Sequence, residues 1–97
     1  MTVWLRAAMV EATANLQAAF LFGSAINANA TARDVDIVLV TKDAAGEKGW
    51  HEIREWRDRL TIDFQELFNI PLSAMIVTPS EWAEIDGVVV RERKALV

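Results

Sequence analysis

The sequence predicts an α/β fold, with a small mixed β-sheet and helices packed on one face. Apolar residues recur at three- and four-residue spacing in two long segments, as they do on one side of an amphipathic helix. Between and after these segments lie short apolar runs bounded by turn-forming residues, as buried strands are. Because helical and strand-like segments alternate along only 97 residues, we expect one domain that spans residues 1–97.

The N-terminal segment is predicted to form a helix over about residues 2–17. Its core face is a stripe of apolar residues spaced four, three and four apart: Leu5, Met9, Ala12 and Leu16. The apolar run at 18–22 then predicts a buried strand, which Gly23 closes. Residues 24–33 are small and polar, and they indicate a single helical turn followed by a loop.

The clearest strand is predicted at residues 34–41, where the apolar run 37–40 indicates burial on both faces. A loop is expected at 42–48. A long helix should follow over about residues 49–69 and end before Pro71. The predicted core face of this helix is apolar at helical spacing: Ile53, Trp56, Leu60, Phe64 and Leu67.

The last part of the chain is predicted to contain a strand, a helix and an edge strand. The apolar run at 72–77 indicates the strand. Thr78 and Glu81 have the spacing of a capping box, with proline at the first helical position, so we expect a helix over about residues 79–86. The β-branched run 88–90 is ambiguous, and residues 94–97 are predicted to form a last edge strand.

Four residues around the first two predicted strands have the clearest chemistry: Gly23, Ser24, Asp34 and Asp36. Alternate residues of a strand share a face, so the two aspartates are expected to hold one or two divalent ions together. Mg²⁺ prefers carboxylate oxygens and completes its shell with water and substrate phosphates. Glycine lets a phosphate approach the backbone, and the serine lies where a helix start would favour an anion. These residues predict a Mg²⁺ site for a nucleoside triphosphate, suited to in-line displacement at phosphorus.

With this motif the chain resembles the DNA polymerase β-like nucleotidyltransferase superfamily, in particular its minimal nucleotidyltransferase members. The resemblance is carried by residues 20–24 (FLFGS) and 34–36 (DVD). It implies the minimal nucleotidyltransferase fold, Gly23 and Ser24 as nucleotide-binding residues, and Asp34 and Asp36 as catalytic metal ligands. ATP is the expected substrate. Many minimal members are antitoxins that transfer AMP to a small helical toxin, so the resemblance implies such a toxin as a partner.

The sequence departs from the resembled family in three ways. Family members usually carry Arg or Lys soon after Gly-Ser, where residues 25–28 here are uncharged, and the gap between the two halves is about one residue shorter. Family catalysis also generally needs a third carboxylate on the strand after the long helix. The run 72–77 contains no acid, and Met75 is its best-matching position. The acids nearest in sequence are predicted on helices: Asp63, Glu66 and Glu81. The alternative to an enzyme is therefore a degenerate module that binds a nucleotide or a protein.

Composition argues against several other classes. The net charge of −4 is unlike that of a dedicated nucleic-acid binder, and the absence of cysteine excludes disulfides and cysteine-based metal sites. No apolar run is long enough to span a membrane, and no signal peptide is visible, so a cytoplasmic location without a membrane partner is expected.

Other candidate residues have weaker signals. His51 is expected on the surface of the long helix, and Lys42 follows the aspartate-bearing strand, where it could reach a phosphate. The basic residues at 54, 57 and 59 alternate with acids, as on a salt-bridged helix face, and the basic tail at 91–94 could contact an anionic partner. The tryptophans are expected mainly in the core. The alternative is an exposed apolar patch for self-association or for a protein partner, which makes a second copy of the chain a candidate partner.

Overall fold

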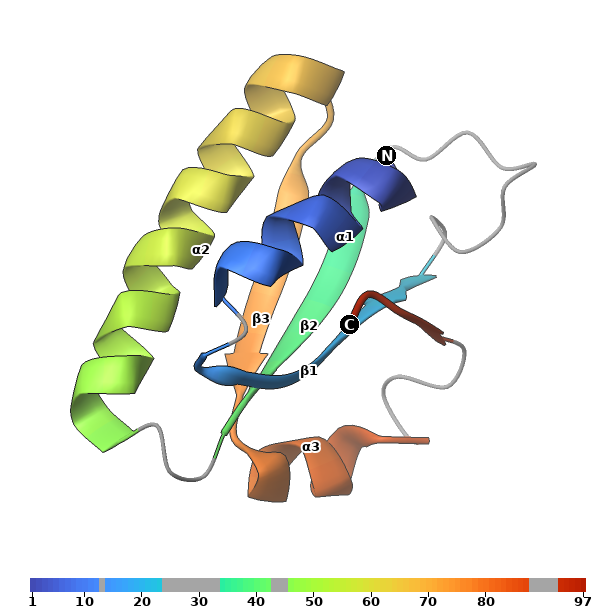
Figure 1. Cartoon of the computed structure of the whole chain (residues 1–97). Coiled ribbons are helices and arrows are strands. Elements are labelled where there is room, and N and C mark those ends of the chain that lie inside the picture. The colour runs from blue at the N-terminus through green and yellow to red at the C-terminus, as the bar shows by residue number, and fades with distance from the viewer. Residues whose placement is uncertain (13, 24–33, 43–45, 88–92) are drawn as a thin grey trace.

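The computed structural model describes residues 1–12, 14–23, 34–42, 46–87 and 93–97. Within these ranges the chain forms both helices and strands (Figure 1). In chain order they are α1 (Thr2–Met9), the 3-10 helix η1 (Val10–Ala12), β1 (Leu16–Phe22), β2 (Val35–Thr41), α2 (Gly46–Phe68), β3 (Leu72–Val77), α3 (Pro79–Ile85) and β4 (Arg93–Ala95). The predicted α/β class is confirmed.

The four described strands form one mixed sheet in the order β3-β2-β1-β4. β2 pairs with β1 in antiparallel orientation and with β3 in parallel orientation, while β4 is antiparallel to β1. The central position of β2 explains why its residues 37–41 are all buried. The predicted small mixed sheet is therefore confirmed.

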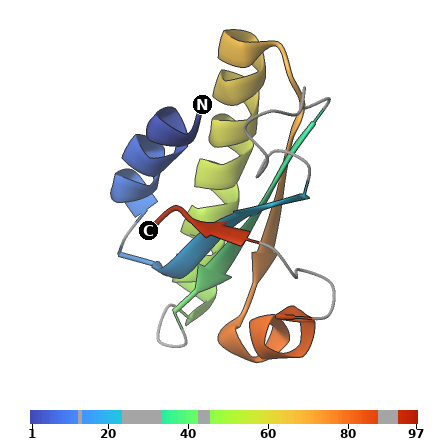
Figure 2. The same cartoon turned by 90° about the vertical axis from the view of Figure 1, so that its right-hand side faces the viewer.

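The two faces of the sheet have different coverings. Residues 35, 37 and 39 of β2 point into the main core with the inward sides of α1 and α2. Residues 38 and 40 point the other way and pack with Val77 and with Trp82 and Ile85 of α3. Figure 2 shows α1 and α2 on one side of the sheet and α3 beyond its other side. Two of the helices thus share a face as predicted, whereas α3 covers part of the opposite face, because its apolar residues pack on the second face of β2 and β3.

The first predicted helix is too long, since the helical segments end at Ala12 and β1 already begins at Leu16. Leu16 is buried in the main core as expected, but it reaches the core from a strand, where it pairs with Thr41. Asn15 lies in the turn that leads into β1, and its backbone carbonyl accepts a hydrogen bond from the backbone N–H of Lys42 at 2.9 Å. A buried apolar residue at helical spacing can belong either to the last turn of a helix or to the start of a buried strand, and the sequence pattern does not distinguish the two.

The long helix begins at Gly46, earlier than predicted, and four of its five predicted core residues are buried. Leu67 is the exception, because 60% of it is exposed. Phe68 packs against the core in its place, in ring contact with Phe64 and Trp4. In the last turn of α2 the core position is therefore taken by Phe68, one residue later than predicted.

The C-terminal elements follow the prediction closely. β3 has the predicted bounds, and the capping box at the start of α3 is confirmed. The Thr78 hydroxyl accepts a hydrogen bond from the Glu81 N–H at 3.2 Å, and the Glu81 carboxylate accepts one from the Thr78 N–H at 3.0 Å. The last edge strand is present, slightly earlier than predicted, while residues 88–90 lie outside the described residues. Among the described helices, none has the length and apolar character that crossing a membrane requires.

Candidate functional site

The two halves of the predicted motif meet where β1 ends and β2 begins. Phe22, the last residue of β1, is the antiparallel partner of Asp36, so Gly23 emerges beside the Asp36 side chain. A Cβ on Gly23 would lie 3.0 Å from the Asp36 carboxylate oxygen Oδ2. The backbone of Gly23 also has a φ of +76°, which side-chain-bearing residues rarely adopt. The positive φ therefore favours glycine here, and a side chain at this position would require the Asp36 carboxylate to shift. Ser24, the other predicted nucleotide-binding residue, lies outside the described residues.

The two aspartates are electrostatically coupled at the start of β2. Asp34 is exposed just before the strand, and Asp36 is half-buried within it. Burial raises the pKa of Asp36 above its ordinary value, and the negative charge of Asp34 raises the pKa further. Both causes penalise the ionised Asp36 carboxylate, and a cation bound between the two aspartates would relieve both. Perturbed carboxylates of this kind are typical of functional sites, although structural clusters show them too.

A serine lies on the other side of Asp36. In the parallel pairing of β2 with β3, Asp36 is opposite Ser73, whereas Met75 is opposite Val38, further along the strand. Both β3 residues lie on the Asp36 face of the sheet, since alternate residues share a face. Met75 therefore lies on the expected strand and face, but Ser73 lies closer to Asp36. Ser73 is not among the predicted site residues, because its place beside Asp36 depends on the pairing register of two strands that are far apart in sequence.

The acids nearest in sequence do not complete the site. Glu81 caps α3 beyond the C-terminal end of β3, whereas Asp36 is near the N-terminal end of the parallel strand β2. Asp63 and Glu66 are exposed on α2, which covers the opposite face of the sheet. Across the described parts of the chain, no three His, Cys, Asp or Glu side chains come together as a metal-binding group. The two aspartates nevertheless fit Mg²⁺, which proteins often bind through one or two carboxylates together with substrate phosphates.

Lys42 and the basic residues of α2 lie away from Asp36. Lys42 follows the last residue of β2, six residues from Asp36 and so about 20 Å along an extended strand. It is therefore too far away to share a phosphate with the aspartates. His51 is exposed on α2, as expected. Arg57 forms an ion pair with Asp58 at 3.1 Å.

On β4, Arg93 lies in the same row of paired positions as Asp36, with Phe22 between them. Its guanidinium forms an ion pair with Asp86 and lies 5.2 Å from the ring centre of Phe20 and 5.3 Å from that of Trp82. The two rings are stacked at 5.0 Å between their centres. Arg93 thus ties α3 and β4 to the sheet face that carries Asp36.

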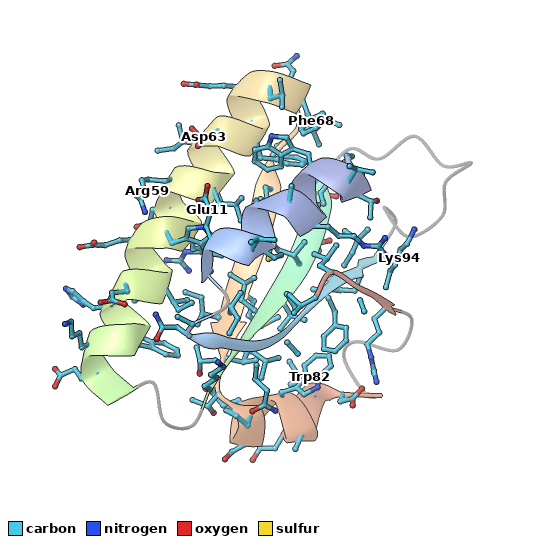
Figure 3. The ribbon with its side chains drawn as sticks, viewed as in Figure 1. Glu11, Arg59, Asp63, Phe68, Trp82 and Lys94 are labelled. Carbon is cyan, nitrogen blue, oxygen red and sulfur yellow. The ribbon has the colours of Figure 1, made fainter. Side chains whose placement is uncertain are left out.

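A separate hollow of about 390 Å³ lies between α1 and α2. Trp4, Trp56 and small alanines line it, and Figure 3 shows its charged residues Glu11, Arg59 and Asp63 near one another. Because α1 and α2 cover the opposite face of the sheet from Asp36, this hollow is not part of the aspartate site.

No family model matches the sequence, and no match was found among curated proteins. The fold is similar to that in the 1.40 Å crystal structure of a putative nucleotidyltransferase from Sulfolobus solfataricus. The match has a TM-score of 0.55 at 16% sequence identity, and it covers 98% of this chain and 78% of that chain. A likeness at this identity establishes the fold. The chain therefore has the fold of that protein, which confirms the predicted nucleotidyltransferase fold.

Proposed function

We propose that the protein is a Mg²⁺-dependent nucleotidyltransferase that transfers a nucleoside monophosphate, with ATP as the expected donor. The observation that carries this proposal is the contact between the two halves of the motif. The Asp36 carboxylate lies 3.0 Å from the position that a Cβ on Gly23 would occupy, so a phosphate chain over the glycine would reach a cation held by the aspartates. The shared fold supports the same function.

In this proposal Asp34 and Asp36 hold the cation, and Gly23 and Ser24 hold the phosphates. The cation supplies charge neutralisation at the phosphates. The protein residues supply positioning, which together with charge neutralisation accounts for most of the catalysis in phosphoryl-type transfer. Gly23 contributes space for the phosphates, since a side chain there would occupy the volume beside Asp36 Oδ2. The acceptor suggested by the resembled family is a small helical toxin in the same cytoplasm.

A binding module without catalysis is the second candidate, and the composition of β3 favours it. No residue of β3 is acidic, and the position beside Asp36 is a serine. Without a third carboxylate the site has fewer groups to activate an attacking hydroxyl, and the loss of a general base typically lowers a rate by 10²–10⁴-fold. A nucleotide and a cation can still bind under these conditions.

The first test is whether ATP with Mg²⁺ or Mn²⁺ raises the melting temperature of the wild type. Ligand at 100 times its dissociation constant stabilises the native state by about 2.7 kcal/mol. Asp36→Asn should abolish the shift, whereas Asp63→Asn removes a charge from the exposed side of α2 and should keep it. No cation-dependent shift at millimolar nucleotide would contradict both candidate functions.

Transfer of AMP from α-labelled ATP to a toxin partner then separates the two candidates. Transfer by the wild type that is lost in Asp34→Asn supports the enzyme. A cation-dependent thermal shift without transfer to the partner supports the binding module.

A further inference from the structure

Ser73 has a specific place in the aspartate site, on the opposite side of Asp36 from Gly23. Asp36 pairs with Phe22 of β1, which Gly23 follows, and with Ser73 of β3. Neighbouring strands lie about 4.8 Å apart, and paired residues point to the same face. An ion bound by Asp36 would therefore have Phe22 and the glycine turn on its β1 side and the Ser73 hydroxyl on its β3 side.

The chemistry of the β3 residues distinguishes Ser73 from Met75. Mg²⁺ and Mn²⁺ favour oxygen ligands, so a hydroxyl can join their shell, whereas the thioether of methionine suits softer metals. Ser73 is exposed, so its hydroxyl can turn toward an ion without first leaving a buried position. Met75 lies further along β3 beside Val38, which belongs to an apolar cluster.

We propose that Ser73 supplies the third protein oxygen to the divalent cation held by Asp34 and Asp36, and that cation binding consequently depends on bound nucleotide. This rests on the proposed nucleotide site. A serine hydroxyl adds an oxygen but no charge, so two carboxylates provide all the negative charge that these side chains offer. The phosphates of a nucleotide supply the remaining charge and oxygens. Linkage then requires that the cation and the nucleotide strengthen each other's binding by the same factor.

Mn²⁺ is a suitable probe, because electron paramagnetic resonance measures the concentration of free Mn²⁺ without any assay of activity. The titrations compare the wild type with Ser73→Ala, Ser73→Asp and Met75→Asp, each with and without a non-hydrolysable ATP analogue. Met75→Asp is the matched control, since it places the same carboxylate on the same strand and face but opposite Val38. Circular dichroism and melting curves confirm that each variant is folded.

The wild type is expected to bind Mn²⁺ about tenfold more tightly with the analogue than without it. Ser73→Ala should lose several-fold in affinity for Mn²⁺ with the analogue. Ser73→Asp should bind Mn²⁺ alone about tenfold more tightly than the wild type, because a third charge lies beside Asp36. Met75→Asp should change the affinity for Mn²⁺ alone much less.

A Mn²⁺ titration of the Asp36→Asn variant separates this proposal from the proposed function. If Asp36→Asn loses Mn²⁺ binding while both Ser73 variants bind as the wild type does, the role of Ser73 is wrong and the aspartate site stands. Equal gains in affinity for Mn²⁺ in Ser73→Asp and Met75→Asp would also overturn the role of Ser73. If Asp36→Asn binds Mn²⁺ and the analogue as the wild type does, the aspartate site itself is wrong.

Discussion

Gly23 lies so close to Asp36 that a single added carbon would touch the carboxylate: the Cβ position of residue 23 is 3.0 Å from Oδ2. The antiparallel pairing of β1 with β2 creates this contact, since Phe22 pairs with Asp36 and the chain turns immediately after it. The glycine turn and the acidic strand therefore lie next to each other. Substitution at either residue should affect the other.

Gly23→Ala should destabilise the protein and displace the Asp36 carboxylate. The positive φ alone costs about 1 kcal/mol for a residue with a side chain, and the collision adds to this. Gly87→Ala is the matched control, because Gly87 has a φ of +82° but none of the residues that the structure describes lies within 4 Å of its Cβ position. Urea unfolding should show a larger loss of stability for Gly23→Ala. Equal losses for the two variants would mean that the contact with Asp36 has no energetic effect.

Asp36→Asn should stabilise the protein at neutral pH in the absence of divalent cations. The pKa of Asp36 is raised in the folded state above its ordinary value of 3.8, so the fold favours the protonated carboxyl. The contribution of the protonated Asp36 carboxyl to the free energy of unfolding is therefore fully present below pH 3.8. This contribution is lost as the pH rises through the folded-state pKa of Asp36. The asparagine variant should gain in melting temperature relative to the wild type at pH 7, and the gain should disappear below pH 3.8.

The control for this effect is Asp63→Asn, which removes the same charge from an exposed position on α2. A similar gain in melting temperature in Asp63→Asn would show that the stabilisation comes from the change in net charge and not from the burial of Asp36 beside Asp34. Mg²⁺ should narrow the difference between the wild type and Asp36→Asn, since the cation offsets the repulsion between the two aspartates.

Leu60→Ala and Leu67→Ala should differ widely, although both leucines lie on the predicted core face of α2. Leu60 is 4% exposed and packs in the main core, whereas Leu67 is 60% exposed. Truncation of a buried leucine costs about 2–5 kcal/mol, and a surface change usually costs about 0.5 kcal/mol or less. Chemical denaturation of the two variants measures the contrast. A similar cost for both would place Leu67 in the core.

Thr78→Ala should cost about 1 kcal/mol of stability, because it removes the hydroxyl that accepts the Glu81 N–H at the start of α3. Thr78→Ser retains a hydroxyl and should retain most of the stability. Glu81→Gln can still accept the hydrogen bond from the Thr78 N–H, so it too should have a small effect. A stable Thr78→Ala variant would show that the packing of Trp82 and Ile85, together with the contacts of Arg93, holds α3 in place without the cap.

The local sequence is sufficient to predict those elements whose signals are local. The bounds of β3, the capping box of α3 and the inward face of α2 as far as Phe64 depend on residues within a few positions of one another. The Gly-Ser and Asp-x-Asp halves are likewise visible as motifs, because glycine at a turn and alternate aspartates on a strand have direct chemical meanings.

Only the tertiary structure decides how these elements meet. The placement of Leu16 in a strand, the exposure of Leu67 and the position of α3 on the second sheet face all follow from contacts between distant segments. The neighbours of Asp36 have the same origin: pairing of β2 with two other strands places Gly23 on one side and Ser73 on the other. Strand register arises from hydrogen bonds between residues far apart in sequence, so the motif predicted the aspartates but not the serine beside them.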